Sequence, residues 1–214
     1  MTTLIVVRHG QSMGNLERRF VGHGDAPLTP LGHRQAELTA DFLSRYPIER
    51  IYSSDLPRAI QTAQPTADRL HLSIFPDRQL REIYAGAWEG LPYDTLDERY
   101  AASYHTWKTD VGHGHPDGGE SVEELSRRIY GEVDRLLREE KGHCIALFTH
   151  ATPVRLMACR WFGYAVEDAA KVPWCGNASI SVIHYGEDGE CRIELYGGEE
   201  HLGELASSFT KGAI

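Results

Sequence analysis

The chain has 214 residues and a formal net charge of −9, from 22 lysines and arginines against 31 aspartates and glutamates. A chain of this length buries about 70% of the surface that its unfolded form exposes, so it supports one well-packed core. No apolar run approaches the roughly 20 residues that cross a bilayer, and the first residues lack the basic start of a signal peptide, so we expect a cytoplasmic protein with no membrane partner. The acidic balance argues against a nucleic-acid partner, although a local arginine cluster can still bind an anionic substrate.

The N-terminal part of the chain alternates between predicted strands and predicted helices. Residues 4–7 are a short apolar, largely β-branched run, which predicts a strand buried on both faces. Thr29 and Pro30 suit the N-cap and the first position of a helix. Residues 49–53 predict a second strand, and the helix that follows it is expected to kink at Pro65. The apolar residues expected to face the core from the first helix are Leu31, Leu38, Phe42 and Leu43.

Residues 76–119 are less periodic and are rich in glycine, proline, tyrosine and tryptophan. Long irregular segments in compact domains are often functional, so we expect an insertion or cap over the active edge of a sheet, with one helix at residues 94–107. The aromatic side chains of this region are expected to form a small core within the cap rather than to line a pocket. They are Tyr84, Trp88, Tyr93, Tyr104 and Trp107.

The C-terminal part predicts further helices and strands and a final hairpin. Residues 121–124 form a capping box that starts a helix, which we expect to end at Gly142. The remaining expected features are a strand at residues 145–148, a helix from residue 152, strands at residues 179–185 and 192–196, a turn at residues 187–189 and a frayed tail at residues 203–214.

This alternation predicts an α/β fold, a three-layer α/β/α sandwich with a mostly parallel central sheet. We expect a single domain over residues 1–214, with residues 76–119 as its cap. In open α/β sheets, ligands bind beyond the carboxyl ends of the strands. His9 and His150 each follow a predicted strand, so the two imidazoles are expected to meet at that edge.

Two arginines and a glutamate suggest what these histidines could do. Arg8 and Arg58 add fixed positive charge, and guanidinium groups match the geometry of phosphate oxygens. A neutral imidazole is a competent nucleophile toward phosphorus, and nearby arginines keep His9 neutral. Glu82, a carboxyl between apolar neighbours, is the best candidate to protonate a leaving group. Arg-His-Gly alone is ordinary loop sequence, so the indication rests on the joint pattern.

Residues 8–12, Arg-His-Gly-Gln-Ser, together with Asn15, resemble the signature of the histidine phosphatase superfamily, also called the phosphoglycerate-mutase-like family. The resemblance continues in order to about residue 155, and its motifs are highly specific when taken together. Further matching segments are residues 22–32, 53–63, 80–90, 118–121 and 149–150.

The resemblance implies a phosphohistidine mechanism in which His9 accepts the phosphoryl group. It implies that Glu82 protonates the leaving group and then acts as the base toward water. The side chains that it implies for holding the phosphate oxygens are Arg8, Arg58 and His150. Those that it implies for the rest of the substrate pocket are Gln11, Ser12, Asn15, Gly22 and Ala151, the last in place of the family's usual glycine. It implies a small phosphorylated metabolite as partner, and no metal and no cofactor, since arginine and histidine supply the positive charge.

Two alternatives share this phosphate pocket. A mutase would return the phosphoryl group from His9 to its substrate, but residues 83–85 and 88–90 look like the phosphatase branch of the family. A binding protein without catalysis would typically lack one of the reacting residues, and all of them are present here.

Residues 174–177 precede a predicted strand and are expected to face the pocket as well.

A third alternative is a metal site in the predicted cap. His105, His113 and His115 cluster there, with Asp110 and Asp117 close by. The spacing is not typical of metal ligands, and the glycine-rich surroundings favour a solvated loop.

Overall fold

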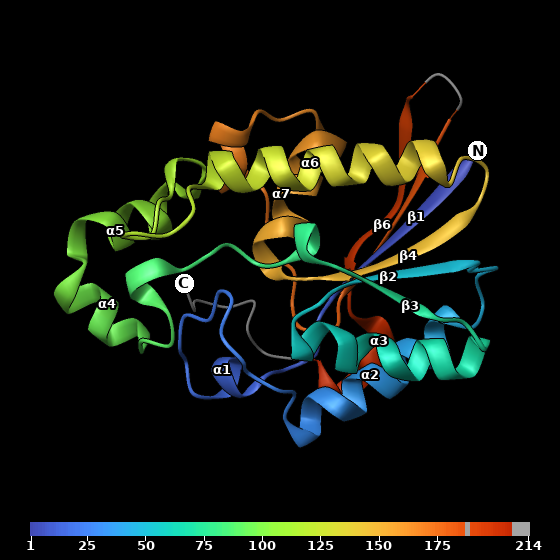
Figure 1. Ribbon diagram of the computed structural model, residues 1–214, viewed down its shortest axis with the longest axis horizontal. Coiled ribbons are helices and arrows are strands. Elements are labelled where there is room, and N and C mark those ends of the chain that lie inside the picture. The colour runs from blue at the N-terminus through green and yellow to red at the C-terminus, as the bar shows by residue number, and fades with distance from the viewer. Residues whose placement is uncertain (187–188, 207–214) are drawn as a thin grey trace.

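The computed structural model describes residues 1–186 and 189–206, which build a six-stranded sheet of order β3-β2-β4-β1-β5-β6 (Figure 1). The strands are β1 (Thr2–Arg8), β2 (Arg50–Ser54), β3 (Ile74–Asp77), β4 (Cys144–Thr149), β5 (Ile180–Tyr185) and β6 (Cys191–Gly198). The first four are mutually parallel, while β5 pairs antiparallel with β1 and β6 pairs antiparallel with β5. The mostly parallel sheet and the final hairpin are therefore as predicted.

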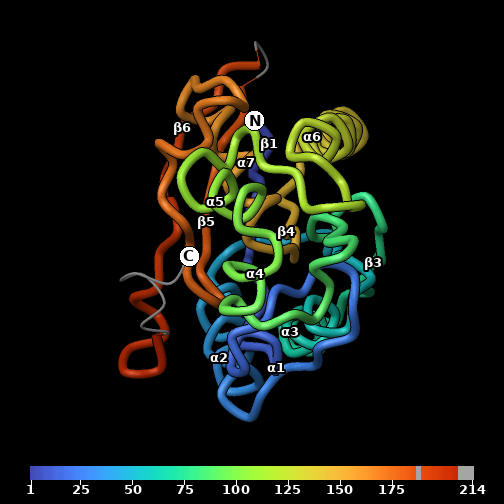
Figure 2. The backbone as a smooth tube through the Cα atoms, turned by 90° about the vertical axis from the view of Figure 1, so that its left-hand side faces the viewer, coloured from blue at the N-terminus to red at the C-terminus, as the bar shows by residue number. Residues whose placement is uncertain are grey.

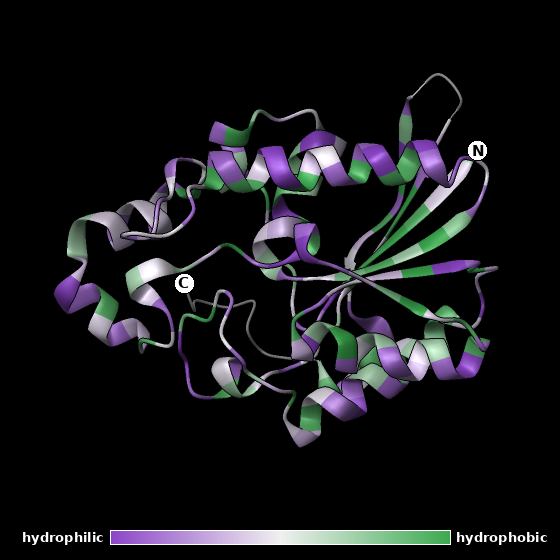
Figure 3. Cartoon of the chain, viewed as in Figure 1, coloured by the Kyte–Doolittle hydropathy of each residue, from purple (hydrophilic) through white to green (hydrophobic). Residues whose placement is uncertain are grey.

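Four long helices cover the two faces of the sheet. Helices α2 (Pro30–Leu43) and α3 (Pro57–Leu70) lie on one face, and α6 (Val122–Glu139) and α7 (Ala151–Phe162) lie on the other (Figure 1). Alternate residues of β1 pack against the helices on the two faces of the sheet, because successive side chains of a strand point to opposite faces. Leu4 and Val6 belong to the apolar cluster under α6 and α7, whereas Ile5 and Val7 belong to the cluster under α2 and α3. This arrangement is the predicted three-layer sandwich, and the central strands are correspondingly apolar (Figure 3).

The helices begin where the sequence places their caps. Thr29 accepts a hydrogen bond from the N–H of Gly32 at the start of α2, and Ser121 forms the predicted capping box at the start of α6. Their ends and inner faces differ from expectation. Helix α6 ends at Glu139 instead of Gly142. Helix α3 contains Pro65, where we expect a kink, and continues to Leu70. The face that α2 buries consists mainly of small and polar side chains, namely Gly32, Gln35, Ala36, Thr39, Ala40 and Leu43.

The prediction for α2 was right for Leu43, which is buried, and for Phe42, which is partly buried and packs against the same cluster. It was wrong for Leu31 and Leu38, which are only partly buried and belong to neither cluster. Small residues at Ala36 and Ala40 let α2 approach its neighbour α3 closely, so the inner face carries few large side chains. A prediction from the apolar pattern alone therefore chose the larger residues, which lie at the edge of the interface between α2 and α3.

Residues between β3 and α6 form a cap beyond the carboxyl ends of the parallel strands (Figures 1 and 2). The cap contains α4 (Tyr93–Arg99) and α5 (Ala101–Thr109), where we expected one continuous helix. The chain leaves the helical conformation at Tyr100, whose φ is −128° and ψ is 34°. Trp88 is fully buried and packs edge-on against Phe20 and Tyr104, with ring centroids 5.2 and 5.6 Å apart. An aromatic core within the cap is thus confirmed for Trp88, Tyr104 and Trp107. The prediction was wrong for Tyr84, which is 46% exposed, and Tyr93 and Trp107 line a cavity.

The C-terminal residues are held against α2 as far as they are described. A 3-10 helix spans Glu200–Leu205, and the side chain of Gln35 donates a hydrogen bond of 2.8 Å to the carbonyl of Leu205. The predicted fraying was therefore wrong for residues 203–206, and residues 207–214 lie outside the described part of the chain. Residues 187–188 of the predicted turn also lie outside it. Within the described ranges, no helix is long and apolar enough to cross a membrane.

Candidate active site

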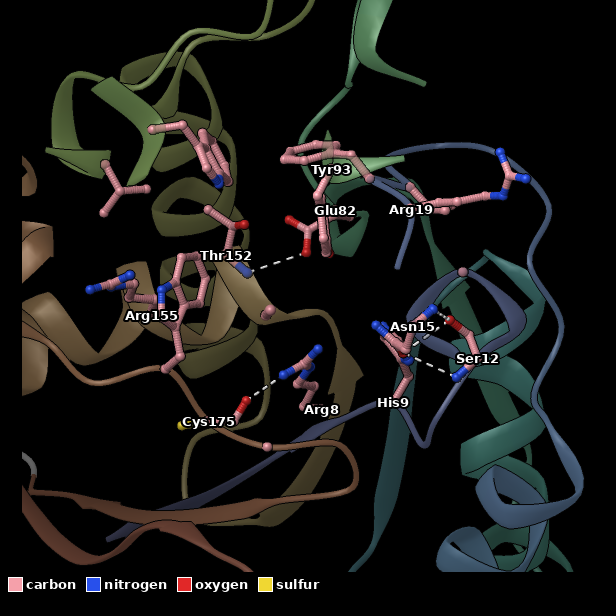
Figure 4. Close-up of a pocket in the computed structure, with 18 of the residues that line it drawn as sticks. Arg8, His9, Ser12, Asn15, Arg19, Glu82, Tyr93, Thr152, Arg155 and Cys175 are labelled. Atoms are coloured by element: carbon pink, nitrogen blue, oxygen red, sulfur yellow. Dashed lines mark hydrogen bonds between the residues drawn. The ribbon is translucent and has the colours of Figure 1, made fainter. Parts of the chain in front are cut away.

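A cavity of about 530 Å³ opens at the carboxyl ends of β1 and β4, between the sheet and the cap (Figure 4). The end of β1, the segment around the short helix α1 (Met13–Leu16), the start of α7 and the cap all contribute side chains. Of the predicted site residues, those that line it are Arg8, His9, Ser12, Asn15, Arg58, Glu82 and Ala151. The sequence therefore located the pocket correctly.

His9 follows β1 directly and is 4% exposed. Its Nδ1 lies 2.7 Å from the carbonyl oxygen of Gly10, and because a carbonyl can only accept, Nδ1 carries the proton. Nε2 is then left with a free lone pair. Burial, followed by the charges of Arg58 and Arg8, holds the pKa of His9 well below its usual value. His9 is thus a neutral imidazole with one nitrogen prepared for nucleophilic attack.

Gly10 fixes the turn that carries His9. Its N–H donates to the hydroxyl of Thr62 at 2.9 Å, and that hydroxyl donates to the carbonyl of Arg58. A Cβ at Gly10 would lie 2.7 Å from the carbonyl oxygen of Gly32, which is too close for any other residue. The turn that carries His9 is therefore tied to α3, the helix that carries Arg58.

His150, the N-cap residue of α7, packs against His9 with ring centroids 5.1 Å apart. The two imidazoles meet as the parallel topology predicted. Nε2 of His150 is hydrogen-bonded to the hydroxyl of Ser54 at 2.7 Å, while its buried Nδ1 has no partner among the described residues. Burial and the charge of Arg58 lower the pKa of His150 well below its usual value. His150 lies behind the cavity wall, whereas the next residue, Ala151, is part of that wall.

Arg8 and Arg58 bring two buried guanidinium groups to the cavity. Arg58, in the first turn of α3, donates to the carbonyls of Gly22 at 2.8 Å and Gly24 at 3.1 Å. Arg8 donates to the carbonyl of Cys175, and its buried Nε has no partner within the described ranges. Burial lowers the pKa of Arg58 to about 10, so it stays charged at neutral pH.

Neither of these two arginines has a carboxylate within 4 Å among residues 1–186 and 189–206. Buried charges are normally paired, because an unpaired charge loses its hydration without compensation. Two buried cations without a nearby carboxylate at one cavity therefore indicate a binding site for an anion.

Glu82 lies across the cavity from His9 and is 8% exposed (Figure 4). One carboxylate oxygen accepts the N–H of Ile83 at 2.8 Å, and the other accepts the N–H of Thr152 at 3.3 Å. Both oxygens are thus oriented by backbone donors, one from its own loop and one from the start of α7. A carboxyl held in this way is placed to exchange a proton with a bound ligand.

The predicted substrate-binding residues fall into two groups. Ser12 and Asn15 line the cavity, and the amide oxygen of Asn15 accepts from the N–H of Ser12 and from Asn177, both at 3.0 Å. Gln11 and Gly22 lie behind the wall. The side chain of Gln11 accepts from the hydroxyl of Thr29, and the carbonyl of Gly22 holds Arg58.

A carboxylate of the cap holds the loop behind Arg58. Glu89 accepts hydrogen bonds from the N–H groups of Gly22, His23 and Gly24, at 2.9, 3.0 and 3.1 Å. The carbonyls of the same loop orient Arg58. Glu89 is in the segment that resembles the family, but nothing in its local pattern indicated this function.

An arginine of α6 holds the loop that carries Glu82 through several hydrogen bonds. Arg128 of α6 donates to the carbonyls of Gln79 at 2.6 Å, Arg81 at 3.0 Å and Glu82 at 3.2 Å. It also forms a two-pronged pair with the carboxylate of Glu120, at 3.0 and 2.8 Å. Sequence reasoning missed Arg128, because its neighbour Arg127 has the same side chain and lies on the exposed face of the same helix.

The end of the cavity away from His9 is lined by aromatic and basic side chains. Tyr93 and Trp107 of the cap line it, together with Trp174 and Arg155. Of residues 174–177, predicted to face the pocket, Trp174, Cys175 and Gly176 line it, and Asn177 lies beneath, bonded to the carbonyl of His9 at 3.2 Å.

The histidines of the predicted metal alternative do not gather. His113 pairs with Asp110 at 2.9 Å, and His115 lies 3.3 Å from the carbonyl of Gly119. No group of three or more histidine, cysteine or acidic side chains in the described residues is arranged to hold a metal ion.

Comparisons with known proteins found a matching family model and several similar proteins. A family model described as the histidine phosphatase superfamily (branch 1) matches residues 4–197. Phosphoglycerate mutase-like protein 4 of Arabidopsis thaliana is 34% identical over 94% of this chain and 87% of its own. Phosphoserine phosphatase 1 of Hydrogenobacter thermophilus is 32% identical over 96% of each chain. The structure of mycobacterial glucosyl-3-phosphoglycerate phosphatase with VO3 is 28% identical, with a TM-score of 0.85 over 92% of this chain and 99% of that one.

Proposed function

The chain belongs to the histidine phosphatase superfamily, and from that premise we propose that it hydrolyses small phosphate monoesters through a phosphohistidine on His9. Phosphatases among its relatives support a phosphoric monoester hydrolase. The observation that carries the proposal is the pairing of a neutral imidazole, whose Nε2 is free, with two buried guanidinium groups that lack counterions among the described residues.

The first step transfers the phosphoryl group. The lone pair on Nε2 of His9 attacks phosphorus while the bond to the leaving oxygen breaks. Glu82, in its carboxylic acid form, gives its proton to that oxygen. The phosphorylated imidazole carries a positive charge, which the carbonyl of Gly10 stabilises through the Nδ1 proton.

The second step releases phosphate. Water attacks phosphorus, the carboxylate of Glu82 takes its proton, and the bond to Nε2 breaks so that the lone pair returns to His9. Arg8 and Arg58 offer N–H donors to the phosphate oxygens in both steps, and the unpartnered Nδ1 of His150 lies behind the same site. These side chains supply the positive charge that the transition state needs, so the proposed reaction requires no metal ion.

Phosphate release from p-nitrophenyl phosphate in excess EDTA tests this function. We expect turnover in the wild type and a loss of nearly all of it in His9→Ala, which stays folded. A matched control is His33→Ala, because His33 is an exposed histidine on the outside of α2. Turnover that survives in His9→Ala would contradict the proposed nucleophile.

A mutase is the second candidate, because the relatives include phosphoglycerate mutase-like protein 4. A mutase holds its phosphohistidine long enough to return the group to a substrate hydroxyl. Conversion of 3-phosphoglycerate to 2-phosphoglycerate with a bisphosphate primer distinguishes the two. We expect phosphate release without this conversion, and rapid conversion would favour the mutase.

A further inference from the structure

Arg155 is a buried arginine in the cavity that the proposed reaction does not use. It lies four residues after Ala151 and three after Thr152 on α7, so the three side chains share one face of the helix, and all three line the cavity. Figure 4 shows Arg155 on the opposite side of the pocket from His9, with Arg8 between them. Arg155 therefore lies at the end that receives the leaving group, not at the phosphate end.

The guanidinium group of Arg155 is held rigidly. Nε donates to the carbonyl of Ala169 at 2.8 Å, and Nη2 donates to the carbonyl of Ala170 at 3.3 Å. The guanidinium carbon lies 4.1 Å from the ring centroid of Trp174, which is close enough for a cation–π contact. A planar group fixed on three sides offers its remaining N–H donors in a set direction, which suits a carboxylate or phosphate.

The charge of Arg155 has no acidic partner in the described residues. Its side chain is 7% exposed, no carboxylate there comes within 4 Å, and its Nη1 has no hydrogen bond to the described chain. Burial lowers the pKa of Arg155 to about 10, so the group remains a cation at neutral pH. Two further basic side chains line the cavity, and both are already paired, Arg19 with Glu17 and Lys108 with Asp97.

We propose that Arg155 and Trp174 form a subsite for a second anionic group, so that the preferred substrates are phosphate monoesters whose leaving group carries a carboxylate. This proposal rests on the proposed phosphatase function and names the class of its substrates. The two backbone carbonyls that Arg155 holds are neutral, so they leave its charge uncompensated until such a ligand enters. A carboxylate that accepts from the free N–H donors supplies the missing charge and displaces water from a site already built for it.

Two pairs of substrates test the subsite, because each pair differs only in a carboxylate against a CH2OH group. The short pair is 3-phosphoglycerate and glycerol 3-phosphate, and the long pair is 6-phosphogluconate and glucitol 6-phosphate. We expect the wild type to prefer the carboxylate member of at least one pair by about tenfold or more in kcat/KM. The preference should fall to about one in Arg155→Gln and remain at the wild-type value in Arg160→Gln.

Arg160 is a matched control for Arg155. It is on the same helix and its guanidinium group also lies over an aromatic ring, that of Tyr130, but it is exposed and pairs with Asp134. A second variant, Ala170→Glu, leaves Arg155 in place and adds an internal carboxylate beside it, from an exposed residue that lines the cavity. It should also abolish the preference. Each ratio is measured within one preparation, so partial unfolding lowers both rates and leaves the ratio unchanged.

Failure of the subsite and failure of the catalytic proposal give different results. Calorimetric binding of the same four compounds to His9→Ala repeats the comparison without turnover. Hydrolysis with equal rates within both pairs, or an unchanged preference in Arg155→Gln, would overturn the subsite alone. A carboxylate preference in binding with no hydrolysis by the wild type would support the subsite and overturn the phosphatase.

Discussion

Replacing Arg128 by glutamine should impair proton transfer by Glu82 while leaving the phosphate site in place. Arg128 holds three carbonyls of residues 79–82 and the carboxylate of Glu120, and its side chain is 16% exposed. Breaking a buried pair of this kind costs about 3 kcal/mol, the low end of the usual range because the pair keeps some exposure. In a chain of this size that loss lowers Tm by about 6–12 °C.

The loss of activity in Arg128→Gln should be partial, because two backbone hydrogen bonds to Glu82 remain. The N–H groups of Ile83 and Thr152 continue to orient its carboxylate, so only part of the about 10²–10⁴-fold benefit of a general acid is lost. We expect kcat/KM for an alkyl phosphate to fall by about 10- to 100-fold. The kcat/KM for p-nitrophenyl phosphate should fall by less than about threefold, because this ratio reports the first step and its leaving group departs without a proton.

The assay compares both substrates in Arg128→Gln and in Arg127→Gln at temperatures where each variant is folded by circular dichroism. Within the described part of the chain Arg127 pairs only with Glu123, and its side chain is 66% exposed, so its replacement should change neither rate. Equal losses on the two substrates would refute the idea that Arg128 acts through Glu82. So would an alkyl phosphatase activity that Arg128→Gln leaves intact.

Three further results are expected. Glu82→Gln should lower kcat/KM for alkyl phosphates by at least about 100-fold and that for p-nitrophenyl phosphate far less, and equal losses in kcat/KM would remove Glu82 as the acid. Gly10→Ala should destabilise the fold and abolish turnover, since its Cβ meets the carbonyl of Gly32, and a thermal melt and activity like the wild type would contradict this. The lowered pKa of His9 means that the unfolded chain binds a proton more readily below about pH 6.5, so stability falls with falling pH by up to about 1.4 kcal/mol per unit from this group. Denaturant unfolding of His9→Asn should show a flatter dependence between pH 6.5 and 5, and an unchanged slope would argue that His9 is not buried and neutral.

The sequence predicted which residues lie together at the cavity, because their placement depends on topology. The sequence predicted two short buried strands, and in the structure these strands, β1 and β4, are parallel. His9 and His150 each follow one of them, so the two side chains meet at the same edge of the sheet. His9, the two arginines and Glu82 all belong to segments whose order along the chain resembles the family. Local pattern and strand order were enough to bring them together.

Features that depend on the tertiary environment were not predictable in this way. Strand β3 was missed because Ile74–Asp77 is a short, largely exposed edge strand that contains Pro76, and only its pairing with β2 makes it a strand. The break at Tyr100 between α4 and α5 interrupts an apolar spacing that reads as continuous. Arg128 differs from Arg127 only in the side of α6 that it occupies, which the packing of the helix decides.

Trapping the phosphoenzyme tests the central claim most directly. Wild-type enzyme is mixed with a phosphate-labelled monoester, quenched within its first turnovers, and digested for mass spectrometry. The account predicts a phosphoryl group on His9, stable to base and labile to acid, and its absence from His9→Ala. Label on any other residue, or turnover with no covalent label at the earliest quench times, would contradict a phosphohistidine on His9.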